Sequence, residues 1–147
     1  MILLDTNVVS EPLRRAPDAA VVAWLDAQSL PTLYLSAISL AELRFGIAAL
    51  PAGARREALQ RALQERVLPL FEGRILPFDA AASQAYGVLM AQARAQGRAI
   101  GAADGYIAAI ARTHALTVAT RDTAPFAAAG LPVINPWTAT PPPLDPV

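Results

Sequence analysis

Residues 1–12 read MILLDTNVVSEP. The stretch begins with four apolar residues, 1–4, and this apolar run stops at the carboxylate of Asp5. An unbroken apolar run of this kind predicts a strand that is buried on both faces, as in the middle of a parallel sheet. Asp5 would then end a central strand. It could stand there only as the N-cap of the next helix, or its carboxylate could take part in chemistry. The other acidic residues of the chain decide between these interpretations.

Helical and strand-like stretches alternate along the rest of the chain, which predicts an α/β fold with mainly parallel strands. We expect one domain over residues 1–137, with a central sheet of about five strands flanked by helices. A Pro-rich tail, residues 138–147, is expected to be poorly ordered. Further strands are expected at 32–36, 73–79, 116–122 and 132–137, and helices at 18–28, 39–50, 54–68, 80–96, 103–114 and 123–130.

The composition excludes several classes of protein. The 147 residues include no cysteine, no lysine and one histidine, which excludes disulfides, thiol catalysis, Schiff-base chemistry and a Walker-type loop. The 12 arginines balance 12 acidic residues, so no overall basic field indicates nucleic acid. No apolar run approaches the roughly 20 residues that cross a bilayer, and no secretion signal is visible. We therefore expect a cytoplasmic protein that does not bind a membrane.

Asp122 is expected to share a crevice with Asp5. It ends the expected strand 116–122, and ligands of open α/β sheets bind beyond the carboxyl ends of the strands. Asp79 also ends an expected strand, 73–79, but it precedes an alanine-rich helix. We therefore interpret Asp79 as a helix cap.

Two further carboxylates lie on helices with strongly apolar surfaces. Glu42 lies in SLAELRFGIAAL, residues 39–50, where apolar residues occur nearly all round the helix. This helix is expected to be buried, and its carboxylate to need a cation or an arginine partner. Asp104 continues the apolar stripe of Ile107 and Ala108 in the first turn of its helix. That position also suits an ordinary first-turn acid, because the helix dipole stabilises a negative charge there.

Carboxylates that converge with no lysine or histidine nearby repel one another, and a hard divalent cation is the ordinary way to hold them ionised. Mg²⁺ or Mn²⁺ would activate water and stabilise a displacement at phosphorus, which is the chemistry of metal-dependent nucleases. We therefore expect a catalytic pocket formed by Asp5, Glu42, Asp104 and Asp122. Asp5, which ends the central strand, and Asp104, which lies in the first turn of a helix, are the expected direct metal ligands.

Six stretches of the chain resemble the PIN-domain ribonucleases, and specifically the VapC/FitB-like toxins of type II toxin–antitoxin systems. They follow the order of that family and extend over almost the whole chain to Trp137. The stretches are LLDTNVVSE (3–11), ISLAELRFGI (38–47), GRILPFD (73–79), ADGYIAAIA (103–111), LTVATRD (116–122) and INPW (134–137).

The resemblance implies a PIN-like, Rossmann-like three-layer sandwich with its acidic pocket at Asp5, Glu42, Asp104 and Asp122. It also implies an endoribonuclease that uses Mg²⁺ or Mn²⁺ to cleave RNA, forms a homodimer and is inhibited by a small VapB/FitA-like antitoxin. One stretch departs from the FitB-like pattern, in which T-R-N is followed by an Asp-Phe pair. Here Asp122 replaces the asparagine and Pro125 replaces the later aspartate. Asp122 ends a neighbouring strand and, given the asparagine that similar proteins carry at its position, is expected to act at longer range.

Thr6 and Asn7 are expected to act from just outside the pocket. They could hydrogen-bond to Asp5 or position the attacking water. The alternative is that they form an Asx or ST turn that leads into the next helix. Trp137 is expected to be a packing residue.

Four arginines of the expected helix 54–68 could contact an RNA backbone, since phosphate contacts dominate nucleic-acid affinity. Two glutamates interrupt the run, so a solvated, salt-bridged face is the favoured interpretation. The arginines are Arg55, Arg56, Arg61 and Arg66, and the glutamates are Glu57 and Glu65.

Three other functions were weighed for the same residues. A phosphoaspartyl enzyme is disfavoured, because those enzymes rely on a lysine and the phosphatases among them need D-x-D, where this chain has Asn7. Two alternatives stay open. One is a catalytically weak PIN domain that binds an antitoxin and acts as a co-repressor, and the other is a DNA-directed nuclease on the same scaffold.

Overall fold

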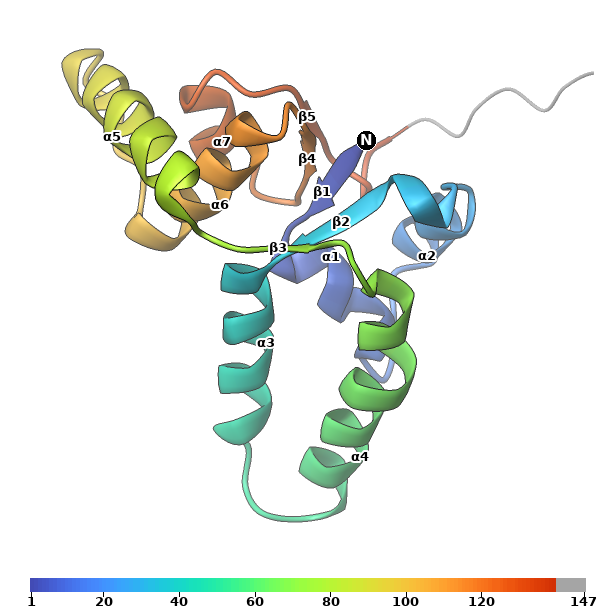
Figure 1. Cartoon of the computed structure of the whole chain (residues 1–147). Helices are drawn as coiled ribbons and strands as arrows, with labels where there is room; N and C mark the ends of the chain where they lie inside the picture. The colour runs from blue at the N-terminus through green and yellow to red at the C-terminus, as the bar shows by residue number, and fades with distance from the viewer. Residues whose placement is uncertain (140–147) are drawn as a thin grey trace, which may run out of the picture.

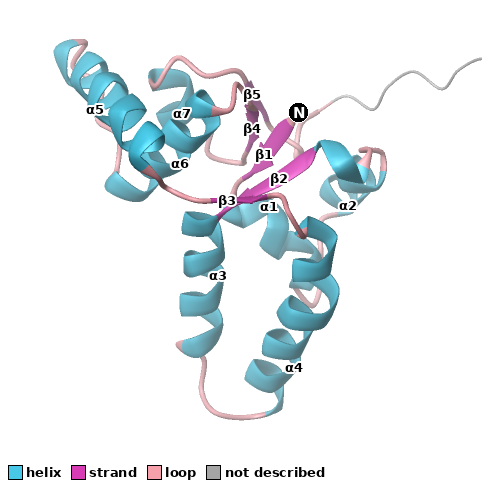
Figure 2. Cartoon of the chain, viewed as in Figure 1, coloured by secondary structure: helices cyan, strands magenta, loops and turns pink. Residues whose placement is uncertain are grey.

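Five short parallel strands form the centre of the protein, in the order β3-β2-β1-β4-β5. The structure is a computed structural model that describes residues 1–139. Helices lie on both faces of the sheet (Figure 2), which confirms the expected α/β sandwich with a parallel central sheet. The strands are β1 (Ile2–Leu4), β2 (Leu33–Ser36), β3 (Ile75–Leu76), β4 (Thr117–Ala119) and β5 (Val133–Ile134).

Helices connect the strands and cover the sheet (Figure 1). No helix in the described part of the chain is long and apolar enough to span a membrane. The α-helices are α1 (Thr6–Ser10), α2 (Ala19–Asp26), α3 (Ala37–Ala48), α4 (Ala54–Ala62), α5 (Ala80–Ala95), α6 (Ala102–Thr113) and α7 (Ala124–Ala128). Shorter helical segments are the 3₁₀ turns η1 (Glu11–Leu13), η2 (Leu30–Thr32) and η4 (Leu68–Phe71) and the π-helical turn η3 (Leu63–Val67).

Successive side chains of β1 point to opposite faces of the sheet and so join two separate cores. Leu3 packs with Val118 and with residues of α5, α6 and α7. Leu4 packs with Ala119 and with residues of α1, α3 and η3. Leu3 and Leu4 are 0% and 1% exposed, so the strand is buried on both faces, as its unbroken apolar run predicts.

The order of the strands reverses at β1. From β1 the chain adds β2 and β3 on one side, and later β4 and β5 on the other. The carboxyl ends of β1 and β4 therefore flank the crevice in which open α/β sheets bind their ligands. Asp5 follows β1 directly, and its backbone N–H donates to the carbonyl oxygen of Ala119 at 2.9 Å. Residues 5 and 120 thus leave the sheet side by side.

Three expected strands are clearly shorter than the sequence suggests, and one of them is β5, which covers Val133–Ile134 instead of 132–137. β3 ends at Leu76, where Pro77 removes the next backbone donor. Asp79 therefore lies beyond the strand, and its carboxylate accepts from the N–H of Ala82 at 3.0 Å, which confirms Asp79 as the cap of α5. β4 ends at Ala119, so the expectation that Asp122 ends a strand is wrong. Asp122 lies in the loop between β4 and α7.

The helix that carries Glu42 is only partly buried, contrary to expectation. α3 and α4 project from the sheet as a two-helix arm (Figure 1). Leu43 and Ile47 are buried, but Phe45 on the opposite side is 75% exposed and Glu42 is exposed as well. A helix can be apolar on several sides without its own chain covering all of them.

The segment after α4 also differs from the single helix expected over 54–68. The α-helix ends at Ala62 and continues as the π-helical turn η3 and the 3₁₀ turn η4. Pro69, which lacks an N–H donor, lies in η4. Most of the expected tail, residues 140–147 of 138–147, falls outside the described residues.

Candidate active site

Asp5 occupies two structural roles at once. It is the N-cap of α1, and its Oδ1 accepts from the backbone N–H of Thr6 at 2.8 Å. Its Oδ2 accepts from the hydroxyl of Thr120 at 2.8 Å. The residue is only 6% exposed, and burial raises the pKa of its carboxyl above the ordinary 3.8, while the two donors lower it and the charge of Asp122 raises it. Capping and a chemical role are therefore compatible interpretations of Asp5.

Thr120 is the residue of this site that the sequence analysis missed. It is fully buried directly after β4. Its hydroxyl donates to Asp5, and its Oγ1 accepts from the backbone N–H of Asp122 at 3.1 Å. One side chain thus fixes the buried carboxylate and the start of the loop that carries Asp122. The motif LTVATRD contains this threonine, but its partner Asp5 is too far away in sequence for a local pattern to identify it.

Glu42 and Asp104 lie close enough to Asp5 to interact with it electrostatically. Partial desolvation, followed by the charges of Asp5 and Asp104, raises the pKa of Glu42. Burial, followed by the charges of Asp5 and Asp122, raises the pKa of Asp104. Asp104 is half-buried in the first turn of α6, with Ile107 behind it in the core. The structure therefore brings the four predicted carboxylates to the same edge of the sheet.

The two residues after Asp5 have different contacts. The hydroxyl of Thr6 lies near Glu42 and lowers its pKa, yet Thr6 Oγ1 is buried and forms no hydrogen bond of ordinary geometry within residues 1–139. Asn7 Oδ1 accepts from the backbone N–H of Arg121 at 3.2 Å. Asn7 thus ties α1 to the loop after β4, rather than binding Asp5 as the sequence analysis considered.

The carboxylates of the site lie at one edge of the sheet but do not form a complete coordination sphere for a metal ion. Over residues 1–139, no group of three or more His, Cys, Asp or Glu side chains is close enough to hold a metal ion by itself. Glu42 also makes no ion pair there, which removes the arginine partner considered for it. The site contains three carboxyl groups with raised pKa values and the buried hydroxyl of Thr6. The three groups belong to Asp5, Glu42 and Asp104. Oxygen atoms of these kinds are the ligands that Mg²⁺ and Mn²⁺ prefer.

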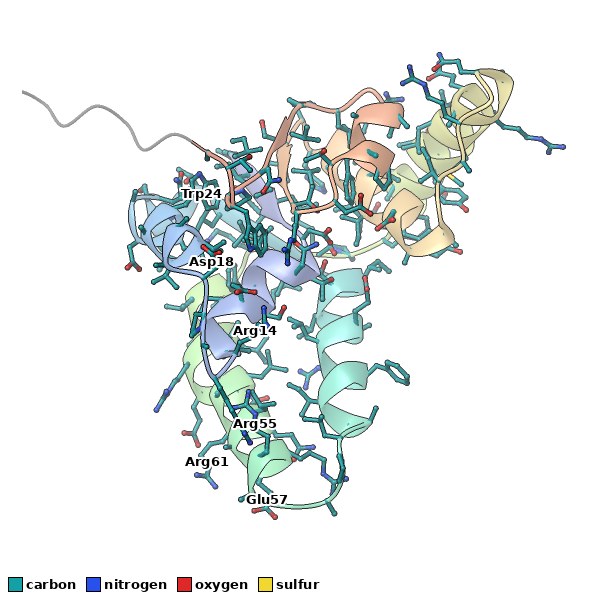
Figure 3. The ribbon with its side chains drawn as sticks, turned by 180° about the vertical axis from the view of Figure 1, so that it is seen from behind. Arg14, Asp18, Trp24, Arg55, Glu57 and Arg61 are labelled. Atoms are coloured by element: carbon teal, nitrogen blue, oxygen red, sulfur yellow. The ribbon has the colours of Figure 1, made fainter. Side chains whose placement is uncertain are left out.

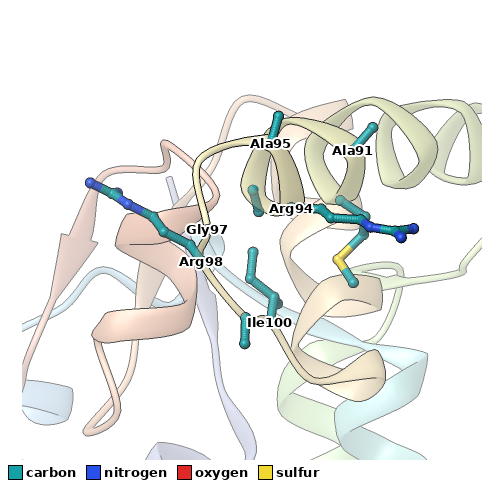
Figure 4. Close-up of a pocket in the computed structure, with 9 residues that line it drawn as sticks. Ala91, Arg94, Ala95, Gly97, Arg98 and Ile100 are labelled. Atoms are coloured by element: carbon teal, nitrogen blue, oxygen red, sulfur yellow. The ribbon is translucent and has the colours of Figure 1, made fainter.

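A separate hollow of about 910 Å³ lies at the end of α5 and has no acidic residue in its lining. Arg94 and Arg98 line it, but their guanidinium groups point away from each other (Figure 4). They therefore do not converge on one anion. Arg98 also lines a neighbouring hollow together with Asp122.

The arginines of the 54–68 segment do not form the salt-bridged face that was favoured. The ion pair found in the described part of the chain joins Arg14 to Glu11 at 3.3 Å, and none involves this segment. Arg55 instead donates to the carbonyl oxygen of Leu13 at 3.0 Å. Arg61 points outward from α4, away from the sheet (Figure 3).

Removing the Thr120 hydroxyl should weaken the site measurably. Thr120→Val keeps the shape of the side chain but leaves Asp5 Oδ2 without its donor and the Asp122 N–H without its acceptor. We expect the free energy of unfolding at neutral pH to fall by about 1–3 kcal/mol, the usual cost of an unsatisfied buried group. Thr120→Ser retains the hydroxyl and should lose clearly less in the same chemical denaturation experiment. Equal losses in the two variants would show that packing, not the hydrogen bond, matters.

The stability of the metal-free protein should depend on pH through Asp104. Its raised pKa means that the charged carboxylate costs folding free energy as pH rises through the folded pKa, and the cost is absent well below the unfolded value of about 4. In EDTA, Asp104→Asn should therefore melt higher than the wild type at neutral pH, and the gain should vanish in acid. Glu72→Gln, which removes one exposed carboxylate from the turn after η4, far from α6, is the charge-matched control. If the wild type is at least as stable as Asp104→Asn at every pH, the site carboxylates do not destabilise the folded protein by repelling Asp104.

Comparisons with known proteins identify the family of the chain. The PIN domain family model matches residues 2–131. The chain is 62% identical over 137 residues to VapC ribonuclease Y4jK of Sinorhizobium fredii, covering 93% of this chain and 98% of that protein. It is 56% identical over 137 residues to toxin FitB of Neisseria gonorrhoeae, covering 93% of this chain and 99% of that protein.

A solved structure of FitAB bound to a DNA fragment superposes with a TM-score of 0.92 at 52% identity, covering 95% of this chain and 98% of that one. The chain belongs to the PIN-domain family, in the group that contains the VapC-like and FitB-like proteins.

Proposed function

We propose that this protein is the toxin of a type II toxin–antitoxin pair and acts as a divalent-metal-dependent endoribonuclease in the cytoplasm. The observation that carries the proposal is the convergence of Asp5, Glu42, Asp104 and Asp122 at the switch point of the sheet, where three of them have raised pKa values. Such a cluster is unfavourable by itself and becomes favourable when a cation is bound. The relatives named as a VapC ribonuclease and as toxin FitB support the same activity.

The donor set fits Mg²⁺ or Mn²⁺, and Asp5 and Asp104 would hold the ion. Asp5 is fixed by two donors, and Asp104, whose pKa the charge of Asp5 raises, lies in the first turn of a helix, so both are held by regular elements. Thr6 Oγ1, buried and without a partner in the described chain, is a further oxygen that a bound water could satisfy. A divalent cation there would neutralise a phosphodiester and make a water molecule a stronger nucleophile.

The remaining acids would position groups around that ion. Glu42 lies on the arm and is exposed, so it can change its protonation and reach a water at modest cost. Asp122 is exposed and lies in the loop held by Thr120 and Asn7, whereas Asp5 is buried. We assign Asp122 to orienting water or a second ion rather than to holding the first one.

Two protein partners belong to the proposal. The uncompensated negative charge of Glu42 and Asp104 suits a basic side chain, most simply an arginine, of a VapB/FitA-like antitoxin. Such a side chain would take the place of the metal's positive charge and block the site. A second copy of the chain would cover the exposed side of α3 around Phe45, which the resemblance to homodimeric toxins implies.

The alternative function is that of a catalytically weak antitoxin-binding co-repressor. The solved structure of FitAB bound to a DNA fragment favours this reading, because that assembly holds DNA. The presence of all four carboxylates favours catalysis. A DNA-directed nuclease on the same scaffold would show itself by cleaving single-stranded DNA as fast as RNA.

RNA cleavage by purified variants tests the proposal. Wild type with a mixed RNA pool should cleave in Mn²⁺ and not in EDTA. Asp122→Asn should lose activity by about 10–100-fold, the usual cost of a group that acts on a metal site from outside. Asp5→Asn and Asp104→Asn should lose more. Arg61→Gln, an exposed position on the arm, should keep full activity.

Each other outcome has a definite meaning. A preparation in which Asp5→Asn cleaves as well as the wild type contains a contaminating nuclease or a different active site. Loss of cleavage in every preparation, with antitoxin binding intact, would favour the co-repressor. If Asp122→Asn proves as inactive as Asp5→Asn, the assignment of Asp122 to longer range is wrong.

A further inference from the structure

Arg121 is a basic residue on the loop that carries Asp122. It stands between Thr120, which binds Asp5, and Asp122. Its backbone N–H donates to Asn7 Oδ1 at 3.2 Å, so its position is fixed relative to α1. The site as described above gives its side chain no role.

The guanidinium of Arg121 lies over an aromatic ring. Its central carbon is 5.2 Å from the centroid of the Trp137 ring, within the range of a cation–π contact. Trp137 follows β5, and the N–H of Thr120 donates to the carbonyl oxygen of Ile134 at 2.9 Å, so the chain after β5 lies beside the chain after β4. Because the strands are parallel, Trp137 reaches the same edge of the sheet as Asp5.

Trp137 is itself well anchored. Its backbone N–H donates to Asn135 Oδ1 at 3.0 Å, and its ring packs against the core cluster that contains Leu4 and Val8. The expectation that Trp137 is a packing residue therefore describes only part of its surroundings. The ring also supports the guanidinium of Arg121, on the loop that carries Asp122.

The guanidinium is available to an anion. Over residues 1–139 it makes no ion pair within 4.0 Å, even though Asp122 is its neighbour in sequence. A guanidinium is weakly hydrated, stacks on aromatic rings and binds phosphate oxygens in a bidentate manner. An RNA strand that enters a site with four carboxylates meets repulsion, and a cation held on the loop that carries Asp122 would offset part of it.

We propose that Arg121, supported by Trp137, binds a phosphate of the RNA strand that neighbours the phosphate to be cleaved. This inference rests on the proposed ribonuclease function and names the residue pair that holds its substrate. Arg121 supplies the charge and the paired donors. Trp137 restricts the guanidinium to one position, so that less freedom is lost when the phosphate binds.

Direct RNA binding tests the contact separately from catalysis. The probe is a fluorescein-labelled single-stranded RNA of mixed sequence, titrated in EDTA so that cleavage does not consume it, at several salt concentrations. Loss of one phosphate contact lowers the slope of log affinity against log salt by about 0.7 for a single strand, which corresponds to about fivefold in affinity near roughly 0.1 M salt. Arg121→Gln should show both changes. Arg61→Gln, which removes an equal charge on the arm, should show neither.

Two further variants separate the effect of the Arg121 charge from the effect of the Trp137 ring that holds the guanidinium in place. Arg121→Lys keeps the charge and should keep the salt slope, but it should bind less tightly because the planar fork and the stacking are lost. Trp137→Leu should likewise keep the slope and lose affinity. In cleavage assays with Mn²⁺, Arg121→Gln should raise KM far more than it lowers kcat, as expected for a group that binds substrate and transition state alike.

Several results would overturn the inference. An unchanged salt slope in Arg121→Gln, or an equal change in Arg61→Gln, would show that no local phosphate contact exists. If Arg121→Gln weakens binding of the antitoxin but not of RNA, the pair serves a protein partner instead. A wild type that binds RNA with the predicted dependence on Arg121 but never cleaves it would sink the ribonuclease proposal and leave the contact standing. A wild type that binds RNA neither in EDTA nor in Mn²⁺ would overturn both.

Discussion

A carboxylate buried at the end of the central strand is the constraint on which the rest of this site depends. Asp5 is 6% exposed and carries no basic partner within ion-pair distance in the described chain. An ionised carboxylate in such a place costs free energy unless donors or cations compensate it. Two neutral donors, the Thr6 N–H and the Thr120 hydroxyl, supply part of that compensation. They are not enough, since the pKa of Asp5 is still raised.

The other acids are distributed so that the edge stays foldable without a bound ion. Asp5 is buried, Asp104 is half-buried, and Glu42 and Asp122 are exposed. Charge is therefore concentrated near one buried group, while the surrounding carboxylates remain near solvent, where repulsion is screened. The projecting arm of α3 makes this possible, because it carries Glu42 to the edge of the site without enclosing it. This distribution lets the acidic edge fold without a bound ion and keeps the carboxylates around Asp5 near solvent.

The sequence predicted those features that depend on local patterns. The apolar run before Asp5 indicated the central strand, and the alternation of helices and strands indicated the parallel sheet. Because ligands of such sheets bind beyond the carboxyl ends of the strands, the place where the acids meet could be predicted as well. The role of Thr120 could not, because its hydrogen-bond partner lies 115 residues away. The exposure of Phe45 could not either, since an apolar surface looks the same in sequence whether the chain itself or a partner covers it. The early end of β3 at Leu76 could have been predicted from Pro77.

The most direct test of the account is a crystal structure of the protein with Mn²⁺, with the ion located by its anomalous scattering. An anomalous peak should lie between the carboxylates of Asp5 and Asp104, at about 2.0–2.2 Å from an oxygen of each, near the distances that ions of this kind adopt. The same experiment on Asp5→Asn should lose the peak. A peak elsewhere, or equal occupancy in the variant, would contradict the claim that the buried carboxylate of Asp5 organises the cation site.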